Sequence, residues 1–175
     1  PFDWFQEPRS FPEKNDTYIK VACQLAVQAI EACLHRAQVS VREIDHLLFV
    51  STTGIATPSI DALVANRLSV SPHMKRTPIW GLGCAGGAVG LARAYEYAQA
   101  FPQSRVLLVT VELCSLTFQR NDLSKSNLIA TSLFGDGAAA ALLCGDDVVI
   151  DTIGDPAPRI LTTRSTLWKN TEDVM

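Results

Sequence analysis

The stretch Trp80-Gly81-Leu82-Gly83-Cys84-Ala85-Gly86-Gly87-Ala88-Val89-Gly90 decides the fold. It joins a segment that we expect to be a strand, residues 76–82, to one that we expect to be a helix, residues 84–101. Glycine permits sharp turns and close approach of backbones, and each glycine inside a helix costs roughly 1 kcal/mol relative to alanine. Three glycines in the first turns are explained if the helix packs tightly against a neighbour or a ligand. The stretch therefore predicts a strand–turn–helix junction with a cysteine at the turn.

Strand and helix patterns alternate on both sides of this junction. Apolar runs predict strands, and apolar residues at three- and four-residue spacing predict helices. The expected strands are 46–51, 76–82, 105–113, 138–143 and 148–153, and the expected helices cover 15–37, 84–101 and 123–133, with a further one starting near residue 57. Such alternation is typical of parallel βαβ units, so we predict an α/β fold whose sheet is covered on both faces. The strand order does not follow from the sequence.

Local signals place several element ends. Asn15 or Asp16 is expected to cap the first helix, and Thr57 followed by Pro58 is typical of a helix start. Ser40 with Glu43 fits a capping box for a short turn. Gly135-Asp136-Gly137 is interpreted as a turn, with catalysis by Asp136 a minor alternative.

Composition narrows the class of protein. The 175 residues are 47% apolar and 19% charged with a net charge of −3, which suits one globular domain and gives no sign of a nucleic-acid or anionic-membrane binder. The longest apolar stretches are too short to cross a bilayer, and no signal peptide is visible, so we expect a cytoplasmic protein. The chain opens at Pro1 and closes after a polar stretch, so we expect a piece of a longer protein.

The five cysteines form no CxxC pair, and their odd number cannot pair completely. We therefore expect reduced thiols and no metal site. Cys84 differs from the others because the N-terminal end of a helix favours a thiolate, and its free N–H groups can stabilise an oxyanion. The alternative is a buried, inert cysteine. The three histidines, His35, His46 and His73, have no motif context and are expected to be structural.

Four motifs together resemble one family. Four segments are similar to those of the type III polyketide synthases, the relatives of the chalcone and stilbene synthases: GLGCAGG (81–87), STTGIATPS (51–59), VELCSLTF (111–118) and SLFGDGAAAALL (132–143). Their amino-acid sequences are closer to those of bacterial members than to those of plant members. The resemblance covers nearly the whole chain. It implies a thiolase-like fold in which residues 1–175 form the N-terminal half, with a mixed, mostly parallel sheet covered by helices. The C-terminal half is absent from this chain.

The resemblance also implies an activity. The family's cysteine at this junction, here Cys84, takes an acyl group from CoA, and malonyl-CoA is then condensed with it by decarboxylation. The chain is thus expected to belong to an acyltransferase that makes a polyketide, of the alkylpyrone, resorcinol or chalcone type. Acyl-CoA and malonyl-CoA would be substrates, with no separate cofactor and no metal, and the enzyme is expected to be a homodimer.

The resemblance places further residues around the substrate. Phe134 is expected to orient the malonyl thioester, and Gly135 follows it in the same motif. Residues expected to line the pocket for the starter or for cyclisation are Thr52, Thr53, Cys114 and Thr117, and Thr57 stands where plant members carry a methionine that reaches across the dimer. Cys114 stands where the plant enzymes have a threonine, and Thr57 stands where they have the methionine. Because of these two differences, we expect long-chain fatty acyl starters rather than aromatic ones.

Other interpretations stay open at this point. Glu112 either supports pocket groups or faces solvent at a strand edge. Two alternatives to the polyketide synthase remain. The nearer one is a ketoacyl synthase of type III, an enzyme that starts fatty-acid synthesis. The second is a non-catalytic module of the same fold. The family's His and Asn partners of the cysteine lie in the second half, so the 175-residue piece alone is expected to be inactive.

Overall fold

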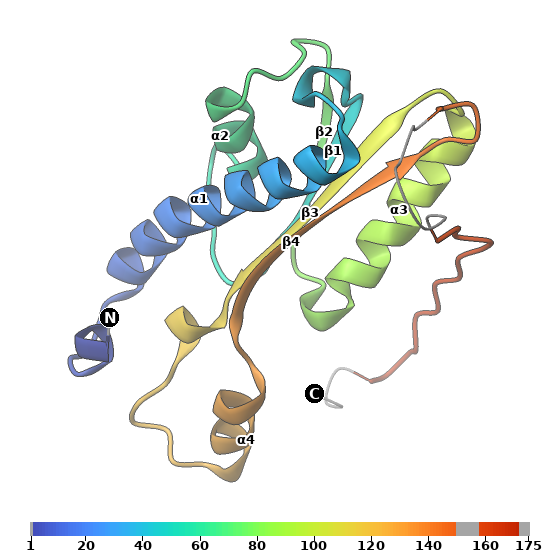
Figure 1. The fold of residues 1–175 in the computed structure, drawn as a ribbon. Helices are drawn as coiled ribbons and strands as arrows, with labels where there is room; N and C mark the ends of the chain where they lie inside the picture. Colours follow the sequence, from blue (N-terminus) through green and yellow to red (C-terminus); the bar gives the residue numbers. More distant parts are fainter. Residues whose placement is uncertain (1, 150–157, 172–175) are drawn as a thin grey trace.

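A four-stranded sheet lies at the centre of the computed structural model, which describes residues 2–149 and 158–171 (Figure 1). Its strand order is β2-β1-β3-β4. The strands are β1 (His46–Val50), β2 (Lys75–Ile79), β3 (Arg105–Leu113) and β4 (Asp136–Cys144). β1 pairs in parallel with β2 and β3, whereas β4 runs antiparallel to β3. The predicted α/β fold with a mixed, mostly parallel sheet is confirmed.

Helices cover the two faces of this sheet. The α-helices are α1 (Phe11–Ala37), α2 (Ile60–Arg67), α3 (Gly86–Ala100) and α4 (Lys125–Leu133), and the 3-10 turns are η1 (Phe2–Phe5), η2 (Val41–Glu43), η3 (Gly83–Ala85) and η4 (Cys114–Thr117). α1 and α2 pack on one face and α3 packs on the other, while α4 extends beyond the end of the sheet (Figure 1). No helix in residues 2–149 or 158–171 combines the length and apolarity needed to cross a membrane.

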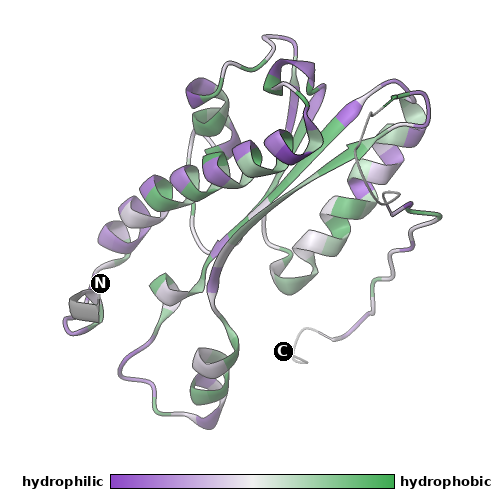
Figure 2. Cartoon of the chain, in the orientation of Figure 1, coloured by the Kyte–Doolittle hydropathy of each residue, from purple (hydrophilic) through white to green (hydrophobic). Residues whose placement is uncertain are grey.

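The central strands are apolar on both sides, as strands covered by two layers must be. Leu47 and Phe49 of β1 face the larger core, which α1 and α2 cover, and Leu48 and Val50 face the α3 side. β3 repeats this alternation, and both strands are coloured as hydrophobic in Figure 2. The sheet is therefore fixed in place from both faces, and its carboxyl end can carry loops with functional side chains.

Two glycines let α3 lie close to the sheet. A Cβ on Gly86 would meet Val50 Cγ1 at 2.6 Å, and one on Gly90 would meet Leu108 Cδ1 at the same distance. Gly87, in contrast, has open space where its Cβ would stand. Tight packing explains Gly86 and Gly90, as the sequence suggested, and the neighbour is the sheet.

The prediction that Asn15 or Asp16 caps the first helix is wrong. α1 begins five residues before Asp16, because Ser10 and Glu13 form a complete capping box in which each side chain accepts a backbone N–H of the other residue. The Asn15 amide instead pairs with both backbone groups of Ile55, at 2.8 Å each. Asn15 therefore ties the loop after β1 to α1.

The predicted start of α2 is also shifted. Ser59 has the extended backbone of an N-cap residue, and the helix begins at Ile60. Thr57 and Pro58, joined by a cis peptide bond, precede the cap and lie in the loop. The Ser40–Glu43 capping box is confirmed at η2.

Three further boundaries differ from the prediction. β2 ends at Ile79, before the glycine turn, and α3 begins at Gly86 because residues 83–85 form the separate turn η3. Asp136 is the first residue of β4, opposite Leu113, so 135–137 is not a free turn. Of the predicted strand 148–153, Val148 and Val149 lie outside any strand, and residues 150–153 are outside the described residues.

Candidate active site

Cys84 lies in the turn between β2 and α3. Gly81 and Gly83 adopt positive φ angles of 85° and 50°, a backbone conformation that side chains disfavour, so the glycines make this turn possible. The Cys84 side chain is exposed in η3, two residues before α3 starts. The cysteine is thus presented to solvent at the carboxyl end of the sheet, and the alternative of a buried thiol is wrong.

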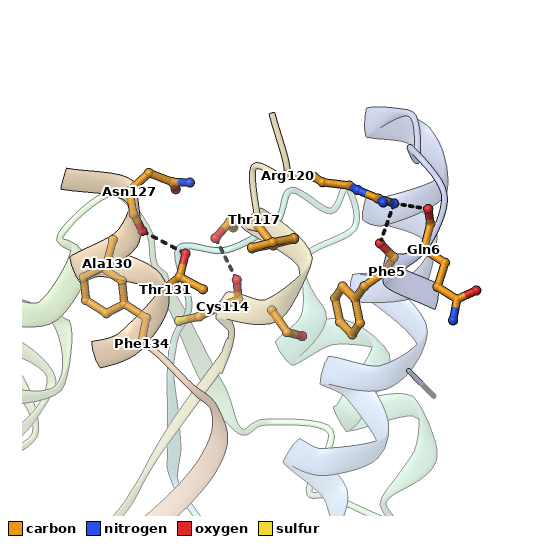
Figure 3. Close-up of a pocket in the computed structure, with 11 residues that line it drawn as sticks. Phe5, Gln6, Cys114, Thr117, Arg120, Asn127, Ala130, Thr131 and Phe134 are labelled. Atoms are coloured by element: carbon orange, nitrogen blue, oxygen red, sulfur yellow. Dashed lines mark hydrogen bonds between the residues drawn. The ribbon is translucent and has the colours of Figure 1, made fainter. Parts of the chain in front are cut away.

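A cavity of about 570 Å³ is lined by residues of η1, η4 and α4, and we call it the Cys114 cavity (Figure 3). Its wall includes Cys114 and Thr117 at the two ends of η4 and Phe134 at the end of α4. Thr117 donates a hydrogen bond to the Cys114 carbonyl at 2.7 Å, which closes the η4 turn. Three residues that the sequence placed in the substrate pocket are therefore brought together.

The Cys114 thiol is partly buried in the wall of this cavity. The pKa of the Cys114 thiol is raised first by burial and then by the negative charges of Glu112, Asp136 and Cys84. Cys84 is not among the residues that line the Cys114 cavity. A thiol with a raised pKa holds little thiolate at neutral pH, so Cys114 is a poor nucleophile there.

Glu112 organises the loop after β1. Its carboxylate accepts the Thr52 N–H at 2.9 Å and the Thr53 N–H at 3.0 Å. The Thr53 hydroxyl in turn accepts the Leu113 N–H at 3.0 Å. Of the two interpretations of Glu112, the structure favours the one in which it supports pocket groups. The Thr52 hydroxyl is buried without a hydrogen-bond partner in the described part of the chain.

The remaining candidates lie at the edge of this region. Phe134 is 53% exposed and borders the cavity, and Gly135 connects it to β4 with open space around its Cα. Thr53 lines a smaller cavity of about 230 Å³ that also includes Thr117. Thr57 is exposed in its loop and lines neither of these cavities. The structure therefore does not bring Thr57 to the candidate site.

Sequence reasoning missed part of the cavity wall. Phe5 of η1 lines it, and Arg120 binds the carbonyls of Phe5 and Gln6, which holds the N-terminal turn against the loop before α4 (Figure 3). Asn127 of α4 completes this wall and donates to the Gln119 carbonyl at 3.0 Å. The Arg120 contacts join segments more than 100 residues apart, and no local pattern in the sequence indicates them.

Asp136 also has hydrogen-bond partners that the sequence did not indicate. It accepts the Ser115 N–H at 2.7 Å and the Ser115 hydroxyl at 2.6 Å. Within residues 2–149 and 158–171, no three His, Cys, Asp or Glu side chains gather as a metal site would require.

Comparison with known sequences gives a consistent result. Residues 7–147 match the family described as "Chalcone and stilbene synthases, N-terminal domain". A putative chalcone synthase of Bacillus subtilis is 50% identical over the whole chain, which covers 50% of that protein. A 1,3,6,8-tetrahydroxynaphthalene synthase of Streptomyces peucetius is 39% identical over the whole chain, which covers 46% of it. The chain thus spans about half the length of the curated relatives it matches.

Solved structures agree with the sequence relatives. The tetrahydroxynaphthalene synthase of Streptomyces coelicolor, a bacterial type III polyketide synthase, superimposes with a TM-score of 0.88 at 32% identity, over 99% of this chain and 48% of that one. CsyB in complex with CoA-SH gives a TM-score of 0.85 at 26% identity, over 97% and 47%. The α/β layers, the cysteine junction and these matches together show that the chain belongs to the chalcone and stilbene synthase family of type III polyketide synthases.

Proposed function

We propose that this chain supplies the nucleophile and part of the substrate cavity of an acyltransferase that makes polyketides from CoA thioesters. The observation that carries the proposal is the exposed Cys84 in the glycine turn between β2 and α3. Relatives named tetrahydroxynaphthalene synthase and phloroglucinol synthase, 39% and 30% identical to the chain, support a condensing activity.

In the proposed reaction, the Cys84 sulfur attacks the carbonyl of an acyl-CoA thioester. A new carbon–sulfur bond forms, the bond to CoA breaks, and CoA leaves as its thiol. Malonyl-CoA then loses CO₂, and its carbanion attacks the acyl–Cys84 carbonyl, which releases the Cys84 thiolate. Backbone N–H groups at the start of α3 are candidate donors to the oxyanion that forms in each attack.

The proposed roles of the cavity residues follow from their places. Phe134 borders the cavity and would orient the malonyl thioester, while Cys114 and Thr117 would contact the growing chain. The Thr52 hydroxyl, buried and unpartnered in the described chain, is a candidate donor to a substrate oxygen. We retain the expectation of fatty acyl starters, because the cavity wall around Cys114 includes Phe5, Phe118, Ala130 and Phe134.

Two partners belong to this proposal. CoA thioesters are the proposed substrates, which the complex of the similar CsyB with CoA-SH supports. A second copy of the chain is the other proposed partner, and the exposed Thr57 loop is the segment that would meet it. The His and Asn partners of Cys84 would come from the part of the complete protein beyond the matched half.

Mass spectrometry of the complete protein, incubated with acyl-CoAs of different chain length, tests the proposal. We expect the acyl mass on the peptide that contains Cys84, a polyketide after addition of malonyl-CoA, and neither in Cys84→Ala. Cys144→Ala, which changes a half-buried thiol outside the cavity, is the control and should be acylated like the native protein. Acylation at another residue would overturn the proposal, and a single condensation that requires malonyl carried on acyl carrier protein would indicate a ketoacyl synthase.

A further inference from the structure

The η4 turn lacks a cap of its own. Leu113, which precedes it, contributes no side-chain hydrogen bond to the free N–H groups that begin such a turn. Yet Cys114, Ser115 and Thr117 of this turn all line the Cys114 cavity, and Leu116 between them is buried. The shape of the cavity wall therefore depends on whatever holds η4.

Asp136 supplies the missing cap from another strand. It starts β4, directly opposite Leu113 in the antiparallel register, so its side chain reaches the beginning of η4. One carboxylate oxygen accepts the Ser115 N–H and the other accepts the Ser115 hydroxyl, at 2.7 and 2.6 Å. Both distances are short, as expected for hydrogen bonds to an ionised acceptor. The residue after Cys114 is thus held at two points.

The same carboxylate acts on the charge state of the neighbouring thiol. The pKa of Cys114 is raised by burial, by Glu112 and by Asp136, in that order, so this cysteine stays protonated near neutral pH. A second thiolate in the cavity wall would compete with Cys84 for the acyl group, because a thiolate is the nucleophile that attacks a thioester carbonyl.

We infer that Asp136 is a positioning residue, which holds the Cys114–Thr117 turn in the cavity wall through its two hydrogen bonds to Ser115 and thereby fixes where the Cys114 thiol lies relative to the acyl chain on Cys84. The inference rests on the proposed function for its acyl-transfer part. The part that concerns the turn and the Cys114 thiol stands on the two Ser115 hydrogen bonds and on the charge of Asp136.

Three variants of the complete protein separate charge from hydrogen bonding. D136N keeps the size of the side chain but removes its charge, and S115A keeps the charge and the backbone bond but removes the hydroxyl. D146N is the matched control, since Asp146 is an exposed acid that pairs with Arg159. The rate at which iodoacetamide labels each cysteine is measured from pH 6 to pH 9 by peptide mass spectrometry, and the acylated residue is identified after addition of an acyl-CoA.

In D136N we expect the labelling of Cys114 to rise severalfold at neutral pH, its pH profile to move to lower pH, and part of the acyl group to appear on Cys114. S115A should raise the labelling rate of Cys114 without moving the pH profile, and D146N should match the native protein. If D136N does not fold, S115A alone decides whether η4 is held through Ser115. Native labelling profiles in both D136N and S115A would overturn the inference. Absence of acyl transfer in the native protein would overturn the proposed function and leave the labelling result valid.

Discussion

The Glu112 carboxylate accepts the backbone N–H of Thr53 at 3.0 Å, and the Thr53 hydroxyl accepts the N–H of Leu113, the residue after Glu112, at 3.0 Å. Each residue therefore fixes the main chain at the other's position. This reciprocal pair joins the end of β3 to the loop after β1, and Thr52 adds another N–H to the same carboxylate. One carboxylate thus binds the backbone of both Thr52 and Thr53.

Replacement of Glu112 by alanine should loosen this loop and destabilise the fold. Each hydrogen bond to a charged group contributes about 1.5–3 kcal/mol, and the half-buried N–H groups would lose their acceptor. We expect E112A to lower the free energy of unfolding by at least about 2 kcal/mol, measured by urea denaturation. E96A, which breaks only the exposed Arg93–Glu96 pair, should cost less than about 1 kcal/mol. Equal losses in the two variants would contradict the role given to Glu112.

The glycines of α3 offer a matched pair of substitutions. In G90A the new Cβ would stand 2.6 Å from Leu108 Cδ1, and overpacking of a core typically costs about 1–3 kcal/mol. In G87A the methyl group would enter open space, and alanine favours the helix by up to about 1 kcal/mol. Thermal unfolding should therefore show a lower melting temperature for G90A and an unchanged or higher one for G87A. The reverse order would show that α3 does not pack as closely as the structure indicates.

The sequence was sufficient to predict the two central strands and the layers, because the strand patterns of 46–51 and 105–113 follow local apolar runs that both faces of the sheet bury. The motif around Cys84 was enough to predict the junction, since the turn depends on glycines that are visible in the chain. The resemblance placed Cys114, Thr117 and Phe134 at the substrate, and the structure shows that the three residues line one cavity. Their contact with a substrate stays a prediction.

The failures concern interactions between distant segments. Asparagine is a residue type that often caps helices, so Asn15 was a reasonable prediction. The helix is capped instead by the Ser10–Glu13 capping box, and Asn15 binds Ile55, 40 residues away. Asp136 between two glycines has the local signature of a turn, and only its pairing opposite Leu113 brings it to Ser115. A single sequence does not contain the strand register, so the partners of Asp136 and Glu112 could not be predicted from it.

Stability should decrease in mild acid through His46. Its ring contacts the Tyr97 ring at 4.4 Å and bonds to the Thr77 hydroxyl, and its pKa is lowered first by burial and then by the charge of Lys75. Because the unfolded chain binds this proton with a pKa of about 6.5, the contribution of neutral His46 is complete above that pH. It is lost as pH falls from there towards the lower folded value.

Urea denaturation at pH 7.5 and at pH 5.5 measures this effect. The native protein should lose stability between the two values, and H46F, which keeps the aromatic contact but cannot be protonated, should lose less. H73F, in the exposed loop before β2, is the control and should follow the native protein. Identical pH dependence in the native protein and H46F would show that other groups cause the loss.

The five thiols should react in an order that the structure sets. Burial is the first cause that raises the pKa of Cys23, Cys33, Cys114 and Cys144, so each of these holds little thiolate at neutral pH. Cys84 is the exposed cysteine at the glycine turn. With limiting iodoacetamide at pH 7.5, we expect the Cys84 peptide to be modified first, and C84S to reduce the total rate to the sum of the rates of the other four thiols. Faster modification of any other cysteine would mean that the β2–α3 turn does not present a reactive sulfur, and the acyl-carrying role of Cys84 would lose its basis.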